Sequence, residues 1–544
     1  MNKITCDVLV VGGGAAGMRA AYAAKRSHPQ LNICLAVTGT FETGGSSNVV
    51  ASEALGINAP LNLQQDGDTP EVYLEDTLDT GGGLGDPTLC RILTEESSDR
   101  IRELAELGVP FHQKDGHFHQ QKLSGCTKAR SLTCGGRTGF QITSRLRDAA
   151  LKLGVRLLEQ VDVLGLRKDA SGRVCGAYGR GAEGAVEFTA GAVVLATGGP
   201  GSIFSVHVTP PSQTGDGWAM AYESGCRFVN LEFFQIGPAV VHPDLTFIIH
   251  SHMWRFLPKL RNRAGEEFLA RYCGGDVTPG KALDLKAMSY PFSVRTGAKY
   301  VDIAIFREIA QGRGTPDGGV WFDVTHIERK ELAEKAPITY RTLLGAGVDC
   351  AKQPLTVTMA VQNFNGGILI DANGFTGVEG LYAAGEVTGG VHGSDRPGGN
   401  NLTDTQVFGH RAGQAAAEYA AAAPPPHPLP IQNSLRLEPT PEERALIAQS
   451  EDLYYQELTV IRRKEGLEKV LEFTRTHLRE DVSVPLRNRL LLGMLFAMAQ
   501  LTRTESRGTH YREDYPDTRG EWQQRLVFRR GGNGMPELCP KERR

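Results

Sequence analysis

The order of apolar and polar residues near the N-terminus predicts a strand, a tight turn and a helix. Residues 7–11 form a short apolar run, rich in β-branched side chains, that ends in glycines, and the alanine-rich residues 15–25 favour a helix. A second buried strand is expected over residues 32–37, at the distance typical of a βαβ unit, and residues 192–195 supply another apolar strand much later. These segments predict an α/β fold whose sheet is assembled from distant parts of the chain.

The pattern changes twice further along the chain. Between residues 231 and 345 the segments are more aromatic and more charged, which indicates an inserted domain. The run from 420 to 430 begins with alanines and ends in prolines, so it predicts a linker, and residues 441–500 have Glu, Leu, Arg and Ala at helical spacing. A chain of 544 residues also exceeds the roughly 250–300 residues that one hydrophobic core usually supports. We therefore expect a nucleotide-binding domain in two parts, residues 1–230 and residues 346–430. An inserted domain over residues 231–345 should separate these parts. A C-terminal helical domain with a tail should follow over residues 431–544.

Composition narrows the classes of partner. The chain has 59 Lys and Arg against 62 Asp and Glu, and a net charge of −3 gives no broad field for nucleic acid or an anionic membrane. No run of about 18 apolar residues predicts a membrane span and no secretion signal precedes the first strand, so we expect a cytoplasmic protein without direct membrane insertion. The ten cysteines include no Cys-x-x-Cys pair, which predicts no metal or iron–sulfur site within this chain. Because no secretion signal is seen, we expect these cysteines to be reduced thiols.

The turn after the first strand carries three glycines in the pattern Gly12-x-Gly14-x-x-Gly17. Glycines at these places permit a tight turn and let the backbone approach a pyrophosphate at the N-terminus of a helix, which is the dinucleotide-binding fingerprint. An ordinary glycine-rich turn is the alternative, but the position between a strand and an alanine-rich helix favours the fingerprint. The second strand ends near Thr38 without the acidic residue that usually binds ribose hydroxyls, so Thr38 is a candidate substitute.

Six later motifs follow in order along nearly the whole chain. They are Ala196-Thr197-Gly198-Gly199, Thr214-Gly215-Asp216-Gly217, Ala383-Ala384-Gly385-Glu386, Val391-His392-Gly393-Ser394-Asp395-Arg396, Gly398-Gly399-Asn400-Asn401-Leu402 and Glu505-Ser506-Arg507-Gly508. Together with the N-terminal fingerprint, this order resembles the flavoprotein family of fumarate reductase, succinate dehydrogenase and L-aspartate oxidase. The resemblance implies an α/β fold with a Rossmann-like FAD-binding domain, an inserted α+β capping domain and a C-terminal helical domain.

The resemblance also implies FAD and the residues that hold it. The expected FAD-binding residues are Gly12, Gly14, Ala15, Ala16 and Gly17 at the pyrophosphate, Thr38, Gly45, Ser46 and Ser47 after the second strand, Ala196, Thr197, Gly198 and Asp216 toward the nucleotide half, Glu386 close to the ribityl chain, and Asn401 and Leu402 beside the isoalloxazine. The glycine-rich turn before Asn401 aims the positive end of a helix at the flavin, which favours its anionic reduced form. A purely structural turn is the alternative.

The attachment of the flavin is expected to be non-covalent. Several family members tether FAD through a histidine in a Ser-His-Thr segment, whereas this chain has Gly44-Gly45-Ser46-Ser47-Asn48 in that place. No histidine lies between His28 and His112. Loss of the tether is expected to lower the flavin potential, which suits a reductase or an oxidase better than a succinate dehydrogenase.

Four residues are candidates for catalysis or substrate binding. Arg396 matches the family arginine that binds a substrate carboxylate, where a guanidinium can form two parallel hydrogen bonds, and a structural ion pair is the alternative. Arg295 is a candidate for the proton-shuttle arginine of the family, although the acid that should follow is missing and the spacing to Gly312-Arg313-Gly314 differs. Arg255 lies near the family's Arg-Gly-Glu-Gly-Gly position, and His392 lies in the same segment as Arg396.

The departures from the family cluster in the expected substrate pocket. The family's Gln-Phe-His-Pro-Thr reads Gln235-Ile236-Gly237-Pro238-Ala239 here, and a second family histidine is replaced by Gln362. Two hydrogen-bonding cations are thereby lost from a site built for a dianion, which disfavours succinate and fumarate. His250 and His252 stand where the family has Thr-Glu-Gly, and they are either new proton donors or packed and surface residues.

Four functions are compatible with these features. The leading interpretation is a flavoprotein subunit that exchanges a hydride between FAD and a carboxylate-bearing or otherwise polarised small molecule, and exchanges electrons with a separate iron–sulfur subunit. The second is a stand-alone oxidase similar to L-aspartate oxidase. The third is a subunit similar to adenylylsulfate reductase, which residues 51–58 resemble. The fourth is a non-catalytic electron relay in a larger redox complex, and the retained Arg396 argues against it.

Overall fold

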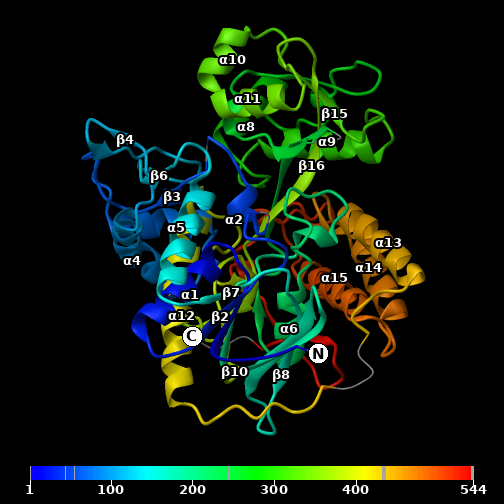
Figure 1. Ribbon diagram of the computed structural model, residues 1–544. Helices are drawn as coiled ribbons and strands as arrows, with labels where there is room; N and C mark the ends of the chain where they lie inside the picture. Colours follow the sequence, from blue (N-terminus) through cyan, green and yellow to red (C-terminus); the bar gives the residue numbers. More distant parts are fainter. Residues whose placement is uncertain (1, 43, 54, 243–244, 432–435, 541–544) are drawn as a thin grey trace.

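The fold combines a large sheet with its helices, a cap and a set of C-terminal helices. The computed structural model describes residues 2–42, 44–53, 55–242, 245–431 and 436–540 (Figure 1). In Figure 1 the cap stands at the top around β15 and β16, and the C-terminal helices α13, α14 and α15 lie at the right. The large sheet lies below the cap, so the three regions meet near the middle of the molecule.

A seven-stranded sheet forms the centre of the lower region. Its order is β7-β2-β1-β10-β9-β8, with β18 also paired to β10. The bounds are β1 (Asn2–Val11), β2 (Ile33–Ala36), β7 (Arg156–Leu158), β8 (Asp162–Lys168), β9 (Val174–Gly181), β10 (Gly184–Leu195) and β18 (Leu381–Ala383). Strands β1, β2, β7, β10 and β18 pair in parallel, whereas β8 and β9 form an antiparallel extension. Successive side chains point to opposite faces, and because Val8, Leu9 and Val10 are fully buried, both faces of β1 are covered.

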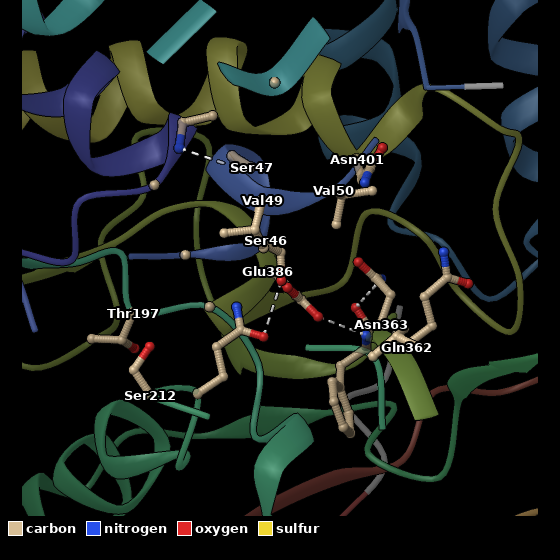
Figure 2. Close-up of a pocket in the computed structure, with 18 of the residues that line it drawn as sticks. Ser46, Ser47, Val49, Val50, Thr197, Ser212, Gln362, Asn363, Glu386 and Asn401 are labelled. Atoms are coloured by element: carbon tan, nitrogen blue, oxygen red, sulfur yellow. Dashed lines mark hydrogen bonds between the residues drawn. The ribbon is translucent and has the colours of Figure 1, made fainter. Parts of the chain in front are cut away.

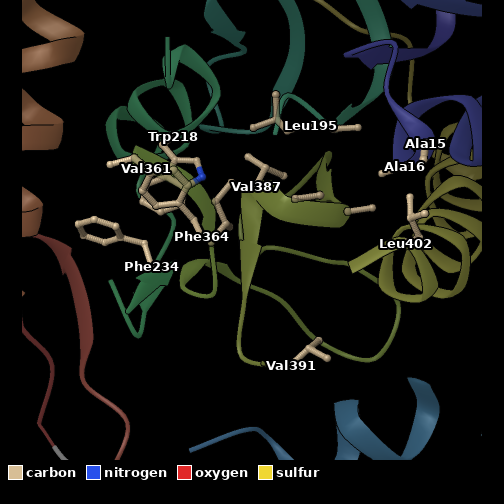
Figure 3. Close-up of a cluster of buried hydrophobic side chains, with 14 of the residues drawn as sticks. Ala15, Ala16, Leu195, Trp218, Phe234, Val361, Phe364, Val387, Val391 and Leu402 are labelled. Carbon is tan, nitrogen blue, oxygen red and sulfur yellow. The ribbon is translucent and has the colours of Figure 1, made fainter. Parts of the chain in front are cut away.

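Two helices from opposite ends of this region pack closely together. They are α1 (Ala15–Ser27) and α12 (Asn400–Ala422). A β-carbon at Gly413 would lie 2.2 Å from the Ala20 carbonyl oxygen, so only glycine permits this approach of the two backbones. Figure 3 shows Ala15 and Ala16 beside Leu402, at the first turns of the two helices. The other elements here are α2 (Ser46–Val49), β3 (Ile57–Asn58), α3 (Pro70–Thr80), α4 (Pro87–Glu106), β4 (Gln113–Lys114), β5 (His117–Phe118), β6 (Ser131–Leu132), α5 (Thr138–Lys152) and α6 (Asp216–Ser224).

The cap contains a five-stranded antiparallel sheet in the order β13-β12-β16-β15-β14. Its strands are β12 (Phe234–His242), β13 (Leu245–Ile248), β14 (Lys259–Arg261), β15 (Val320–Asp323) and β16 (Leu355–Phe364), and its helices are α7 (Ser251–Trp254), α8 (Pro279–Met288), α9 (Lys299–Ala310), α10 (Arg329–Lys335) and α11 (Pro337–Gly345). Strand β16 follows residue 345 in sequence, yet it pairs with β12 and β15 and so belongs to this sheet. Strands β12 and β16 also connect the cap to the lower region, because each adjoins that region at one end.

The C-terminal region is helical and then returns to the lower region. Its helices are α13 (Pro441–Leu458), α14 (Lys464–His477) and α15 (Val484–Thr502). After them, β20 (Val527–Arg530) and β21 (Pro536–Leu538) extend a second five-stranded sheet that also contains β11 (Phe228–Val229), β17 (Gly367–Leu369) and β19 (Thr388–Gly389). The fully buried Arg503 side chain pairs with Glu232 at 2.6 Å and Glu505 at 3.0 Å, which anchors this return. Among the described helices, α15 included, none is long and apolar enough to cross a membrane.

An aromatic cluster joins the three regions below the cap. Phe364, at the end of β16, has its ring centre 5.3 Å from that of Phe234 and 5.8 Å from those of Trp218 and Phe496. Figure 3 shows Phe234, Phe364 and Trp218 packed together next to Val361. Large aromatic side chains bury much apolar surface. This cluster therefore packs the first residue of β12 and the last residue of β16 against α6 and α15.

Candidate functional site

A cavity of about 1080 Å³ lies where the three regions meet. Ligand cavities are typically about 300–1,000 Å³, so this one has room for a large ligand. It is lined by most of the residues that the sequence predicts for FAD and substrate: Gly12, Gly14, Ala15, Ala16, Thr38, Gly45, Ser46, Ser47, Ala196, Thr197, Gly198, Asp216, Arg255, Glu386, His392, Arg396, Asn401 and Leu402. Gly17 and Arg295 are not part of this lining.

The glycine fingerprint forms one wall of the cavity at the start of α1. Gly12 has a φ of +114°, and a β-carbon there would lie 2.2 Å from the Ala196 carbonyl oxygen. A β-carbon at Gly17 would lie 1.8 Å from the Gly12 carbonyl oxygen, so Gly17 keeps the turn tight although it does not face the cavity. Gly14 caps α1 without a side-chain hydrogen bond, and the first turn has no acidic residue. The exposed amides and the helix dipole therefore favour an anion such as a pyrophosphate.

The turn after β2 forms a neighbouring wall. Ser47 Oγ accepts a hydrogen bond from the Ala15 amide at 3.3 Å, and Ser46 Oγ donates one to Gln213 Oε1 at 3.2 Å (Figure 2). Gly45, which precedes α2, has a φ of +79°, a conformation that favours glycine. Thr38 lines the cavity at the place where an acidic residue usually binds ribose.

The nucleotide half of the cavity reaches the C-terminal helices. Asp216, at the start of α6, accepts a hydrogen bond from Asn488 Nδ2 at 2.6 Å. The lining there also includes Leu437, Pro439, Arg444, Ile447, Pro485 and Arg489. Thr197 Oγ1 is buried and has no hydrogen-bond partner among the described residues, so it is available to a ligand. The sequence carried no signal that helices beyond residue 430 would face this cavity.

The opposite half of the cavity contains Glu386 and the start of α12. Glu386 Oε1 accepts a hydrogen bond from the Phe364 amide at 3.1 Å, and Figure 2 shows its carboxylate between Ser46 and Asn363. Burial raises the pKa of Glu386 to about 7. Helix α12 begins after Gly399 without a side-chain cap and without an acid in its first turn, and Asn401 and Leu402 line the cavity.

These features fit FAD as the occupant. Two uncapped helix N-termini, a glycine turn that leaves no space for a β-carbon, and an unpartnered Thr197 hydroxyl line one long cavity. The start of α1 would hold the pyrophosphate, and the start of α12 would face the isoalloxazine. When bound, FAD supplies hydride transfer, which protein side chains cannot perform.

Arg396 lines the same cavity as the residues expected to hold FAD. Its side chain is only 8% exposed, and its Nε has no hydrogen-bond partner among the described residues. Burial lowers the pKa of Arg396, although nearby carboxylates act in the opposite direction. The neighbouring Asp395 accepts hydrogen bonds from the Arg396 amide at 2.9 Å and from Gln235 Nε2 at 3.2 Å, and burial raises its pKa to about 6. A buried guanidinium that lines a cavity and retains an unpaired donor is suited to an anionic group of a substrate.

The cap closes this end of the cavity with neutral polar groups. Tyr290 Oη donates a hydrogen bond to Gln362 Oε1 at 2.9 Å, and the His250 ring centre lies 4.9 Å from that of Tyr290. Burial, together with the neighbouring His252, lowers the pKa of His250 to about 3, so this imidazole is neutral near pH 7. His252 is not part of the cavity lining, and its Nε2 instead lies 2.9 Å from Thr339 Oγ1. Sequence reasoning did not select Tyr290, because no motif marks it.

The other three candidates for catalysis, which are Arg295, His392 and Arg255, lie in different surroundings. Arg295 is 38% exposed and donates a hydrogen bond to Asp79 Oδ2 at 2.6 Å, outside the cavity lining. His392 is buried, and its Nε2 lies 3.2 Å from Asp404 Oδ2. Arg255 lines the cavity and is exposed, so it stands at the rim. Of the three arginines among these candidates, Arg396 is therefore the one that is buried and also lines the cavity.

The cavity combines a dinucleotide-binding wall with a buried guanidinium below the cap. This combination defines a flavin-dependent oxidoreductase. A family model described as FAD binding domain matches residues 7–402, and one described as fumarate reductase flavoprotein C-term matches residues 483–539. The chain belongs to the FAD-dependent flavoproteins of the fumarate reductase, succinate dehydrogenase and L-aspartate oxidase family. This membership confirms the family, the fold class and the FAD cofactor that the motifs predicted.

Three similar proteins illustrate the family. The chain is 32% identical to a fumarate reductase (CoM/CoB) subunit of Methanothermobacter marburgensis, over 96% of this chain and 97% of that protein. It is 31% identical to L-aspartate oxidase of Pseudomonas aeruginosa, over 94% of this chain and 96% of that protein. Among solved structures, Mycobacterium smegmatis Sdh1 in complex with UQ1 superimposes with a TM-score of 0.85 at 29% identity, over all of this chain and 95% of that chain.

Proposed function

We propose that this protein is the flavoprotein subunit of a redox enzyme, in which non-covalent FAD exchanges a hydride with a small carboxylic acid held by Arg396. The observation that carries this proposal is the buried guanidinium of Arg396, which has an unpartnered Nε and lines the same cavity as the residues expected to hold FAD. A bidentate bond to a carboxylate would satisfy that donor and orient the acid. The non-catalytic relay is disfavoured, since a relay does not need a buried cation in its cavity.

The proposed acid carries a single carboxylate at the buried end. The two family histidine positions are Gly237 and Gln362 here, and the pKa of His250 is about 3, so these groups bring no positive charge. A second carboxylate would have to reach an exposed cation of the lining, such as Arg255 or Lys122. Fumarate and succinate are therefore disfavoured on electrostatic grounds, although the M. marburgensis relative carries fumarate in its name.

The proposed electron partner is a separate iron–sulfur protein. The described residues contain no group of three or more His, Cys, Asp and Glu side chains placed to hold a metal ion. The ten cysteines also include no Cys-x-x-Cys pair, so a cluster is expected in another chain. The M. marburgensis relative is named as one subunit of its enzyme, which supports a multi-subunit assembly here. Purification from the native host should bring a cysteine-rich chain with this one, and its absence from a fully active preparation would contradict this part of the proposal.

Anaerobic flavin reoxidation tests the substrate proposal. The FAD-loaded protein is reduced with dithionite and mixed with crotonate, which has one carboxylate, or fumarate, which has two. We expect crotonate to oxidise the flavin faster than fumarate does. Arg396→Met should weaken crotonate binding about 10- to 150-fold, because a hydrogen bond to a charged group contributes about 1.5–3 kcal/mol. The comparison variant Arg255→Met should affect fumarate and spare crotonate, and equal reoxidation of wild type and Arg396→Met would refute the carboxylate site.

A stand-alone oxidase is the second candidate. The 31% identity to P. aeruginosa L-aspartate oxidase over almost the whole chain supports it. Rapid reaction of the reduced flavin with air, with peroxide formed and no accompanying iron–sulfur chain, would favour this candidate. A slow reaction with air would favour the flavoprotein of a multi-subunit enzyme.

A further inference from the structure

Tyr290 connects the two positions at which neutral residues replace the family histidines. It follows α8 in the cap and lines the cavity. A β-carbon at Gly237 would lie 2.2 Å from Tyr290 Oη, so the phenol fills the space that a side chain at position 237 would need. The same hydroxyl donates its hydrogen bond to Gln362 Oε1 at 2.9 Å. One side chain from the cap thus stands beside both replacements.

Charged groups also surround this phenol. Lys286 Nζ lies 5.6 Å from the centre of the Tyr290 ring and forms a buried ion pair with Asp302 at 2.7 Å. Burial and the Asp302 carboxylate hold the pKa of Tyr290 well above its ordinary value, so the hydroxyl retains its proton near pH 7. The positive charge of Arg396 acts on Tyr290 in the opposite direction. If the phenol lost its proton, the positive charge of Arg396 would stabilise the resulting anion, and the Asp302 carboxylate would oppose it.

The other titratable groups in the cavity are less suited to give a proton to an acid held at Arg396. His250 is already neutral, so it has no acidic proton to donate near pH 7. The His392 imidazole faces Asp404 at 3.2 Å. Glu386 accepts a hydrogen bond from the Phe364 amide, on the wall expected to face the ribityl chain. Tyr290 therefore stands out, among the described residues of the lining, as the hydroxyl donor next to the substrate end.

We propose that Tyr290 is the proton donor of the reaction, and that it occupies the place of the histidines that this chain lacks. This inference rests on the proposed function, with an α,β-unsaturated carboxylate as the acid to be reduced. Reduction of the carbon–carbon double bond needs one hydride, which the flavin supplies with both electrons, and one proton. The Tyr290 O–H bond breaks, and its proton forms the second C–H bond at the other carbon of the former double bond. The positive charge of Arg396 acts to stabilise the tyrosinate left behind, which regains a proton from water when the product leaves.

Two phenylalanine variants separate this role from simple packing. Tyr290→Phe removes the proposed proton donor and retains the ring beside Gly237. Tyr455→Phe is the matched control, because Tyr455 also has a buried hydroxyl, which donates to the Met359 carbonyl of β16 at 2.7 Å outside the cavity lining. For each FAD-loaded protein, the dissociation constant of crotonate is measured from the change in the visible spectrum of the oxidised flavin. The rate of reoxidation of the reduced flavin by crotonate and by fumarate is then measured without air.

We expect Tyr290→Phe to slow flavin reoxidation without weakening the binding of crotonate. Tyr290→Phe should slow reoxidation by about 100-fold or more, since general acids typically contribute 10²–10⁴-fold, and its crotonate dissociation constant should stay within about threefold of wild type. Tyr455→Phe should change neither quantity. Gly237→Ala provides a second route, because its β-carbon would displace the Tyr290 hydroxyl, and it should reproduce the slow reoxidation with the tyrosine still present.

The results that would contradict the role of Tyr290 can be distinguished from those that would contradict the proposed function. A Tyr290→Phe protein that reoxidises within threefold of wild type overturns the proton donor and leaves the proposed function intact. A loss of binding equal to the loss of rate shows that Tyr290 only binds the acid, and it also overturns the donor role. If wild type itself binds crotonate and fumarate but is reoxidised by neither, the proposed acid reduction fails, and the role of Tyr290 fails with it.

Discussion

The carboxylate of Glu53 accepts a hydrogen bond from the backbone amide of Thr339 at 2.7 Å, and this contact joins the FAD-binding region to the cap. The same carboxylate accepts hydrogen bonds from the Ile338 amide at 2.8 Å and from Thr339 Oγ1 at 2.9 Å. Helix α11 begins at Pro337, so Glu53 binds the free amides at its N-terminus, where the helix dipole favours a negative charge. Glu53 therefore holds the cap at a point separate from strands β12 and β16, which connect it to the rest of the molecule.

Replacing Glu53 should loosen the cap locally. Glu53→Ala removes every one of these bonds, and the amides of Ile338 and Thr339 should exchange their hydrogens at least tenfold faster, since a hydrogen bond to a charged group contributes about 1.5–3 kcal/mol. Hydrogen–deuterium exchange of α11 measures this effect. Glu42→Ala is the control, because Glu42 is an exposed acid whose ion pair with Arg147 is long, at 3.5 Å. Unchanged exchange in α11 would show that the cap is held by other contacts.

The same contact should weaken in acid. Burial alone would raise the pKa of the Glu53 carboxyl. The nearby His252 and the amide hydrogen bonds outweigh this effect and hold the pKa of Glu53 below its usual range. A group with a depressed pKa stabilises the folded state above its unfolded value, about 4.5, and this contribution is lost as the pH falls through the folded value. The protection of α11 against hydrogen exchange, corrected for the intrinsic effect of pH, should therefore be constant from pH 7 to 5 and fall below about pH 4.5. In Glu53→Gln this fall should be absent.

The packing of α12 on α1 should not tolerate a methyl group. In Gly413→Ala the new β-carbon would lie 2.2 Å from the carbonyl oxygen of Ala20, and backbone atoms cannot move aside cheaply. We expect a loss of about 1–3 kcal/mol, as is typical of overpacking, together with weaker FAD binding because both helices begin at the cavity. Thermal unfolding and an FAD titration measure the two effects. Gly280→Ala, in helix α8, is the control, since no atom lies within 4 Å of the position of its β-carbon.

The flavin should leave the protein intact on denaturation. The segment from Gly44 to Asn48, where several relatives carry the tethering histidine, has no histidine in this chain. Among the residues that line the cavity, the histidines are His250 and His392, and His392 lies against Asp404. Acid precipitation should therefore release all of the FAD to the supernatant. A fluorescent band that stays with the protein in a denaturing gel would contradict this expectation.

Arg295 should matter much less than Arg396. It pairs with Asp79, whose side chain is 78% exposed, and exposed ion pairs contribute only about 0–1 kcal/mol. Arg295→Met should therefore keep the rate of flavin reoxidation by crotonate within about threefold of wild type. A loss comparable to that of Tyr290→Phe would instead restore Arg295 to the role of proton shuttle that the family resemblance suggested.

Much of the fold could be predicted because its signals are local. A β-branched run, a glycine turn and an alanine-rich helix are adjacent in sequence, so β1, Gly12 and α1 could be recognised from their own residues. The order of the later glycine-rich motifs predicted the same cavity for Glu386 and Asn401. Each of these residues faces the cavity because of the turn that contains it, and such turns are encoded over a few residues.

The rest of the site depends on contacts between distant segments. Tyr290 contacts the site of Gly237 in β12 and donates a hydrogen bond to Gln362 in β16. Because these strands are distant from Tyr290 in sequence, no short motif marks it. Two histidines two residues apart, His250 and His252, have different surroundings because only His250 faces the cavity. The pairing of β20 with β11 is equally hidden, since a strand of four residues late in the chain contains no information about its partner.

That late pairing has a consequence for how the protein is made. A nascent chain emerges from the ribosome with β1 first, whereas β18 emerges much later, and the helices beyond residue 430 that line the cavity follow it. Strand β20, which completes the sheet beside β11, follows later still. The lining of the cavity extends to Arg489, so the binding site for the flavin can form only after most of the chain has been synthesised.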